Sequence, residues 1–273
     1  MVISERFLNL YLIINHMSKK VELFRSGEGG IPEGLAKRLV VPAHIGLRGH
    51  SLRPYISNEL VPTGLDFILL EDLNGFYQRL TKNPFGFLSS CRGLYVAKDH
   101  TWIPKKHYEK VNDALKREYG IEVRRALLLP QERVDYWTMV HEALHDVFNH
   151  LQPEQRARLV QSATGAYDSN DNFIDMLNLT HLNITNFEWD LEETSRRMEA
   201  NKRGGRSPLD GFDNFYVFGR LKPKDQLQAV DEFISNFFAN DRGKNRWDGR
   251  HLPHTFRTTL REVGYNMDNP PEV

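Results

Sequence analysis

Hydrophobic and polar positions alternate with a recognisable period only from about residue 65 of this chain. Residues 67–80 place apolar side chains at intervals of three and four, which predicts an amphipathic helix. Residues 93–103 combine β-branched and aromatic residues with a polar turn, which predicts a strand or hairpin. A helix is expected at 106–119, and a strand at 123–129.

The second half of the chain is predicted to be mostly helical. A long helix is expected at 131–151, where no glycine interrupts the pattern and Pro153 closes it. Further helices are expected at 153–164, 171–182, 186–201, 223–240 and 254–264. A few strands followed by many helices indicate the α+β class.

The first 64 residues are predicted to be an extension of the main domain. Residues 18–64 are rich in glycine, proline and basic side chains and indicate an irregular arm. The apolar run at 7–14 lacks the basic start and the small-residue cleavage site of a secretory signal, so a short helix is expected there. The predicted domain then covers 65–273.

Composition and charge narrow the range of functions. The 36 basic and 36 acidic side chains of the 273 residues cancel, so nothing in the overall charge attracts nucleic acid or anionic membranes. No stretch reaches the length of about 20 apolar residues that a membrane helix needs. Cys91 is the single cysteine, which excludes an intramolecular disulfide and a cysteine-rich zinc finger. A cytoplasmic protein that binds neither nucleic acid nor a membrane is expected, and the charge does not indicate an oligomeric state.

One short motif carries candidate chemistry. His141, Glu142 and His145 form a His-Glu-x-x-His pattern inside the helix predicted at 131–151. Positions four apart face the same side of a helix, so both imidazoles could bind one ion. Glu142 would lie beside that ion as a general base. The motif predicts a Zn²⁺ site in a metallopeptidase; the alternative is a surface helix whose histidines are solvated or pair with Asp146.

The third metal ligand has to come from elsewhere in the chain. A metzincin extension is excluded by Phe148 and Leu151, and His150 falls on the opposite side of the helix. Glu232 lies in an apolar helix, one turn before Asn236, so one of them could bind the ion while the other orients a histidine. The competing carboxylates, nearer in sequence to the motif, are Glu188, Glu192 and Glu193.

Together these segments resemble the zincin metallopeptidases of the gluzincin kind, and most closely the ImmA/IrrE-like group. The resemblance covers residues 93–240 and rests on a Gly-Leu-Tyr strand at 93–95, the His-Glu-x-x-His helix and the segment at 232–239. It implies a small mixed sheet whose edge strand, 93–103, lies above the active-site helix and holds an extended peptide or protein substrate. It also implies that His141, His145 and Glu232 bind zinc and that Glu142 is the base. The long spacing before Glu232 requires a helical insertion at about 151–222.

Several roles stay open at the level of sequence. A zincin often has, in addition, a tyrosine or histidine that stabilises the developing oxyanion. The candidates are Tyr216, His251, His254 and Tyr265. The alternative function is a catalytically inactive zincin-like protein with a structural or regulatory role, associated with a partner or with DNA. Its support is limited to basic residues near 196–206.

Overall fold

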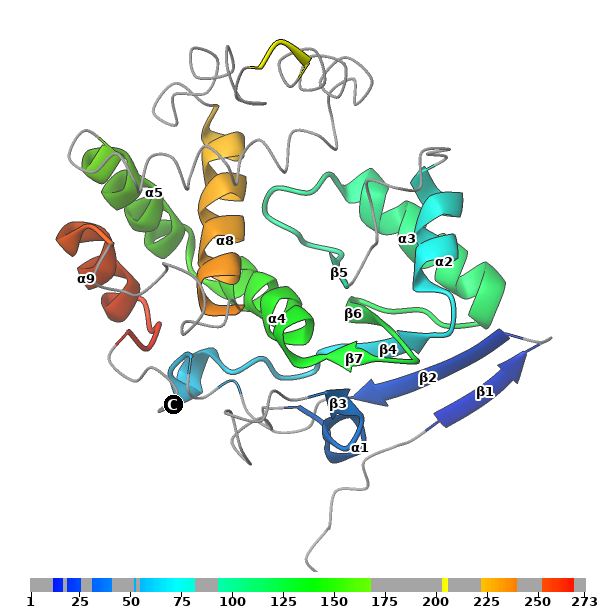
Figure 1. Ribbon diagram of the computed structural model, residues 1–273. Coiled ribbons are helices and arrows are strands. Elements are labelled where there is room, and N and C mark those ends of the chain that lie inside the picture. Colours follow the sequence, from blue (N-terminus) through cyan, green and yellow to red (C-terminus); the bar gives the residue numbers. More distant parts are fainter. Residues whose placement is uncertain are drawn as a thin grey trace, which may run out of the picture.

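A five-stranded mixed sheet lies at the centre of the protein (Figure 1). The computed structural model describes residues 12–16, 19–25, 31–40, 52, 55–81, 93–167, 203–205, 222–239 and 252–267. The strand order is β1-β2-β4-β6-β5, in which β4 and β6 are parallel and the other pairs are antiparallel. The strands are β1 (Leu12–His16), β2 (Lys19–Arg25), β4 (Asp66–Leu70), β5 (Leu94–Ala97) and β6 (Arg125–Pro130).

Helices cover both faces of this sheet. Helices α2 and α3 cover one face of the sheet, and α4, α5, α8 and α9 lie on the opposite side (Figure 1). The main helices are α2 (Leu73–Thr81), α3 (Lys105–Tyr119), α4 (Tyr136–His150), α5 (Pro153–Tyr167), α8 (Pro223–Ala239) and α9 (His254–Glu262). The short elements are α1 (Glu33–Ala36), β3 (Leu39–Val40), the 3₁₀ helix η2 (Asn58–Leu60) and β7 (Val134–Asp135). The α+β class and the mostly helical second half are therefore confirmed.

Alternation along the central strands creates two hydrophobic cores. Leu127 and Leu129 of β6 point to the core shared with α4 and α8, whereas Ala126 and Leu128 point to the core shared with α2 and α3. Successive side chains of a strand face opposite sides, so a strand covered on both faces is apolar throughout. Burying each large side chain contributes about 1.5–3 kcal/mol relative to leaving it in water. The larger core fixes α4, the helix that carries the motif.

The single helix expected at 67–80 is wrong in its first part. Residues 66–70 form β4, and the helix α2 begins only at Leu73. The run from Phe67 to Leu70 is buried on both faces of the sheet between β2 and β6. A short continuous apolar run fits either a strand or a helix by period alone, and pairing with two neighbours decides for the strand.

The N-terminal segment contributes two strands to the sheet, where the sequence predicts a helix at 7–14 and an irregular arm from residue 18. The helix is wrong for the described residues, because Leu12–His16 pairs with Lys19–Arg25, which in turn pairs with β4. Val21 and Phe24 are buried, and the buried Glu22 pairs with Arg38 at 2.7 Å. The apolar run at 7–14 is too short for its pattern to distinguish a helix from a strand. The domain boundary at residue 64 stays a prediction.

Most other predicted elements are confirmed within a few residues. The helix at 106–119 is α3, and Gly120 ends it in the left-handed conformation with φ of 68°. The strand at 123–129 is β6, and the helices at 153–164, 223–240 and 254–264 are α5, α8 and α9. The helices expected at 171–182 and 186–201 lie outside the described residues.

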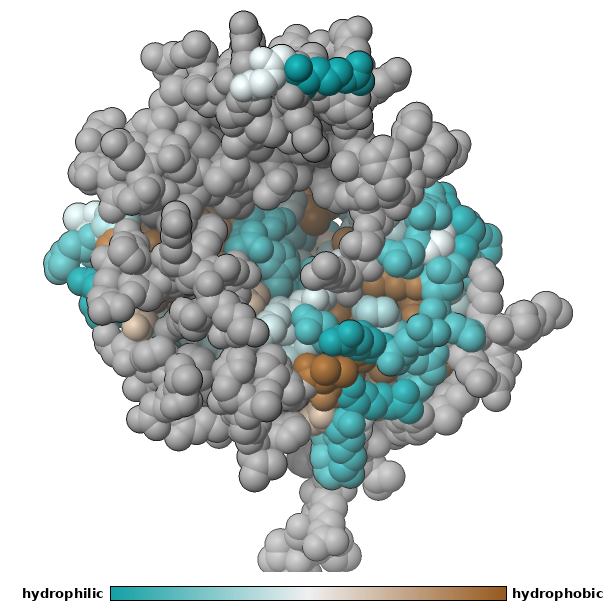
Figure 2. Space-filling view, in the orientation of Figure 1, coloured by the Kyte–Doolittle hydropathy of each residue, from teal (hydrophilic) through white to brown (hydrophobic). Residues whose placement is uncertain are grey.

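The surface in the view of Figure 2 is mostly hydrophilic over α2 and α3, and hydrophobic atoms reach it near β3 and β7. Val40 of β3 is an exposed large hydrophobic residue, at 43%. Within the described ranges, no helix is both long and apolar enough to cross a membrane.

Candidate metal centre

The motif helix α4 is anchored at its beginning and buried along most of its length. The side chain of Asp135 accepts a hydrogen bond from the Thr138 backbone N–H at 2.9 Å and caps the helix. Met139, Val140 and Phe148 have no measurable exposure in the larger core. The predicted helix at 131–151 is therefore confirmed as a central helix, although it begins only at Tyr136, directly after β7.

Both motif histidines lie on one side of α4, and their rings approach each other. The Nε2 atoms of His141 and His145 are 3.1 Å apart. The His145 side chain is 6% exposed and that of His141 is 20% exposed. The pair is thus deep in the protein but can be reached from solvent through His141.

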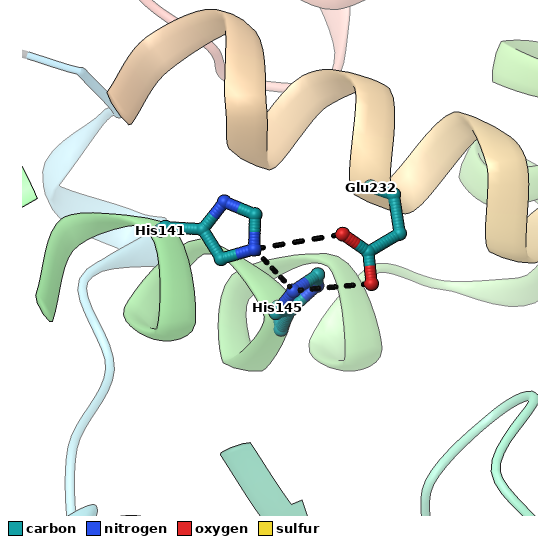
Figure 3. Close-up of side chains that lie close together, drawn as sticks. All are labelled: His141, His145 and Glu232. Carbon is teal, nitrogen blue, oxygen red and sulfur yellow. Dashed lines mark hydrogen bonds and ion pairs between the residues drawn. The ribbon is translucent and has the colours of Figure 1, made fainter. Parts of the chain in front are cut away.

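Glu232 of α8 faces the two rings (Figure 3). Its carboxylate oxygens are 3.5 Å from Nε2 of His141 and 3.7 Å from Nε2 of His145. Ligand atoms of the three residues all lie within 4.8 Å of one another. The packing of α8 against α4 therefore brings together a group, the metal triad, that could hold one ion.

The donor set and its spacing fit zinc. Zinc binds imidazole nitrogen and carboxylate oxygen at about 2.0–2.2 Å, so neighbouring ligands of a tetrahedral ion are about 3.3 Å apart. The 3.1 Å between the two histidine nitrogens is close to this value, and each carboxylate oxygen of Glu232 lies at a similar distance from one histidine, Oε2 at 3.5 Å from His141 and Oε1 at 3.7 Å from His145. Two nitrogens and one carboxylate oxygen also form the ligand combination of several catalytic zinc sites.

The charges of the triad are strongly coupled. Burial acts to lower the pKa of His145, but Asp231 and Glu232 raise it to about 10. Burial acts to raise the pKa of Glu232, but His145 and His141 lower it to about 2. In the ion-free protein the two carboxylates therefore favour the protonated form of His145. A metal would have to displace that proton, so metal binding weakens as the pH falls.

Residues next to Glu232 orient His145. Its Nδ1 lies 3.0 Å from Oδ1 of Asp231 and 3.3 Å from the Ser235 hydroxyl, both fully buried on α8. Trp102 donates its indole N–H to the other oxygen of Asp231 at 2.7 Å. The sequence suggests Asn236 for this role, and that expectation is wrong. The residues that contact Nδ1 of His145 are Asp231 and Ser235, which directly precede Glu232 and Asn236 on α8. With Nδ1 engaged, Nε2 faces the triad.

Replacing Asp231 with asparagine should weaken zinc binding without removing a ligand. Loss of such an orienting carboxylate typically costs about 10- to 100-fold in metal affinity. We expect Asp231→Asn to raise the zinc Kd by that factor in a competition titration with a chromophoric chelator. Asp225→Asn, in the first turn of the same helix, is the control and should leave the Kd unchanged. An unaltered Kd in Asp231→Asn would contradict the orienting role.

Glu142 lies beside the triad and is held by the edge strand. Its Oε2 accepts a hydrogen bond from the backbone N–H of Tyr95 at 2.8 Å. Burial raises the pKa of Glu142, and the nearby His141 and His145 oppose this effect. A carboxylate with a raised pKa is better matched to accepting a proton near neutral pH.

The close approach of β5 to α4 depends on Gly93. A Cβ atom at this position would lie 2.8 Å from Cγ of Glu142 and 2.8 Å from Cγ2 of Thr138, closer than packed atoms allow. Any side chain at residue 93 would therefore push the strand away from Glu142 and lengthen its bond to Tyr95.

Gly93→Ala is accordingly expected to impair Glu142 and spare the metal. Displacement of a catalytic group by about 1 Å can cost about 10²-fold in rate. For the peptidase activity proposed below, we expect that loss in kcat at unchanged zinc content, measured by metal analysis and peptide cleavage. Gly165→Ala is the control, since nothing lies within 4 Å of its Cβ position on α5. If Gly93→Ala cleaves as fast as the parent, the strand does not position Glu142.

The burial of α4 excludes the alternative of a solvated surface helix whose histidines pair with Asp146. Asp146 is fully buried and pairs with the β-sheet: it accepts a hydrogen bond from the Tyr95 hydroxyl at 2.8 Å and lies 3.2 Å from Nε of Arg125. His150, rather than a motif histidine, is the histidine near Asp146, with its Nδ1 3.6 Å from the carboxylate. His150 is thus on the far side of α4 from the triad, as the helical period predicts.

His254 and Tyr265 are the remaining candidates that the structure describes, and neither belongs to the triad. His254 is exposed at the start of α9, and Tyr265 is buried and stacks on Phe238 at 5.4 Å. The other candidates lie outside the described residues, namely Glu188, Glu192, Glu193, Tyr216 and His251.

Sequence reasoning missed Tyr95, Trp102 and Asp231. Asp231 had a visible signal, since two adjacent carboxylates in an apolar helix are costly to bury unless both are paired or bound to an ion. Tyr95 and Trp102 had no such signal, because an aromatic residue near a strand is an ordinary core residue.

Comparisons with known proteins return no match: no family model, no curated protein and no solved structure resembles this chain at a significant level. The assignment of the site therefore depends on its geometry, which is a His141–His145–Glu232 group able to hold a metal ion.

Proposed function

We propose that this protein is a zinc-dependent peptidase of the zincin type, with Glu142 as its general base. The observation that carries the proposal is the convergence of His141, His145 and Glu232, with a fourth polar group, Glu142, directly beside them. A purely structural zinc site is usually closed by four protein ligands. Among the described residues, the metal-binding group contains three.

The chemistry is divided between the ion and the protein. When bound, zinc supplies a Lewis acid that polarises a carbonyl group and lowers the pKa of water. His141, His145 and Glu232 hold the ion, and Asp231 orients His145.

Glu142 moves the proton. One of its oxygens is held by the Tyr95 N–H, which leaves the other to accept a proton from the attacking water. The water oxygen forms a bond to the carbonyl carbon as this proton passes to Glu142. Glu142 then gives the proton to the peptide nitrogen, and the carbon–nitrogen bond breaks.

The position of β5 supports a peptide as substrate. This strand ends the sheet order and lies beside α4, the helix that carries His141 and His145 (Figure 1). An extended peptide can add to a sheet edge by main-chain hydrogen bonds that are largely independent of its sequence. The edge strand would then place a peptide bond near the ion.

Metal removal tests this proposal directly. We expect about one zinc per chain in the purified protein, and about none in His141→Ala or His145→Ala, because both nitrogens are ligands. Treatment with a chelator should abolish cleavage of a random fluorogenic peptide library, and added zinc should restore it. His150→Ala, on the far side of α4, is the control that keeps both zinc and cleavage.

The outcome separates the two candidate functions. A zinc-loaded protein that cleaves no peptide, and whose melting temperature drops on chelation, would be an inactive zincin-like protein with a structural or regulatory role. A protein without bound metal would contradict both.

A further inference from the structure

His100 is a buried histidine that the metal triad does not use. It follows β5 in the turn that leads to α3, and its ring packs against Tyr95 and Trp102 at centroid distances of 5.4 and 4.6 Å. Trp102 in turn contacts the ring of His145 at 6.3 Å. His100 therefore belongs to the aromatic wall beside the triad.

Hydrogen bonds fix the position of the proton on this ring. Nδ1 of His100 accepts the backbone N–H groups of Trp102 at 3.3 Å and Ile103 at 3.2 Å. A backbone N–H can only donate, so Nδ1 carries no proton and the neutral ring must carry it on Nε2. Burial, with the positive charge of His145, lowers the pKa of His100 to about 3, which keeps the ring neutral at physiological pH.

The resulting Nε2–H has no partner in the described part of the chain. Nε2 of His100 is buried and makes no hydrogen bond there. An unsatisfied buried donor costs about 1–3 kcal/mol, so its presence calls for an explanation. The ionised groups that act on His100 are His145 and Glu232, both members of the triad. The ring of Trp102 contacts both His100 and His145, so the spare donor lies on a residue that is separated from the triad by one aromatic ring.

His100 is unsuited to being a fourth ligand. Coordination through Nε2 would need a lone pair there and hence a proton on Nδ1. That proton would collide with the N–H groups of Trp102 and Ile103. The turn after β5 therefore holds His100 as a donor.

We propose that the Nε2–H of His100 donates a hydrogen bond to the carbonyl oxygen of the scissile peptide as negative charge develops on it. This inference rests on the proposed peptidase function. Water attack turns the carbonyl oxygen into an oxyanion, and a neutral donor held rigidly beside it stabilises the transition state more than the substrate. His100 was not among the sequence candidates for this role.

Three variants test the role. His100→Phe keeps a ring between Tyr95 and Trp102 but removes the donor, whereas His100→Gln keeps an N–H₂ near the place of Nε2. His107→Phe, on the exposed side of α3, is the matched control. Loss of one oxyanion donor costs about 10²- to 10³-fold in kcat. We expect that loss in His100→Phe at unchanged zinc content and KM, a smaller loss in His100→Gln, and none in His107→Phe.

Two further readouts do not depend on turnover. A two-dimensional ¹H–¹⁵N spectrum of the metal-free protein should show His100 as the neutral ring with its proton on Nε2. A phosphinate analogue of the cleaved library peptide should bind His100→Phe more weakly by the factor lost in kcat, whereas acetohydroxamate should bind both proteins equally.

The outcomes distinguish the inference from the function it rests on. If the parent protein cleaves peptides and His100→Phe keeps its kcat, or if the proton resides on Nδ1, the role of His100 is wrong while the peptidase stands. If the zinc-loaded parent cleaves no peptide of the library, the peptidase and this role are both overturned.

Discussion

Glu142→Gln is expected to keep its zinc and lose about 10²- to 10⁴-fold in kcat, the usual contribution of a general base. Glutamine has nearly the same shape and can still accept the hydrogen bond from Tyr95, but it cannot take a proton from water. The metal ligands are untouched, so the defect should appear in the chemical step. Zinc analysis together with steady-state cleavage of a library peptide measures both quantities.

Glu154→Gln, on the exposed surface of α5, is the matched control and should behave like the parent. A Glu142→Gln protein that retains full kcat would remove the base from the mechanism and leave the triad as a metal site of another kind. Loss of zinc in this variant would instead identify Glu142 as a ligand.

Glu232→Ala is expected to lose zinc while the protein stays folded. The carboxylate of Glu232 is the ligand that α8 contributes to the triad. Removing an orienting partner costs about 10- to 100-fold in metal affinity, and removing a ligand should cost more. The substitution also removes a half-buried negative charge close to the protonated His145. Metal content after dialysis, and the zinc Kd by competition, measure the effect.

Glu192→Ala supplies the decisive comparison, because Glu192 represents the competing carboxylates at 188–193. Zinc retained in Glu192→Ala and lost in Glu232→Ala supports the proposed triad. The reverse pattern would move the third ligand to the 188–193 segment. Circular dichroism of the metal-free variants checks that neither result reflects unfolding.

The helical period explains why much of the site can be predicted from sequence. His141 and His145, four positions apart in a segment without glycine or proline, have to share one side of a helix. The same period excludes His150, which the structure places near Asp146. Glu232 could be nominated because a carboxylate in an apolar helix is costly to bury unless it is paired or bound to an ion.

The parts that could not be predicted depend on contacts between distant segments. The run at 67–70 becomes a strand because β2 and β6 lie on either side of it, and no local pattern contains that information. The choice of Asp231 over Asn236 as the partner of His145 depends on the rotation of α8 against α4. The orphan donor of His100 arises from the turn after β5, which brings two N–H groups to Nδ1.

The helices that form the triad come from distant parts of the chain, as the 90-residue separation between His145 and Ser235 illustrates. An ion bound by both helices would act as a cross-link that exists only in the native state. At a free zinc concentration of 100 times Kd, such binding adds about 2.7 kcal/mol to the free energy of unfolding. A chain starved of zinc would then be degraded sooner as well as being inactive, so metal supply would govern its abundance.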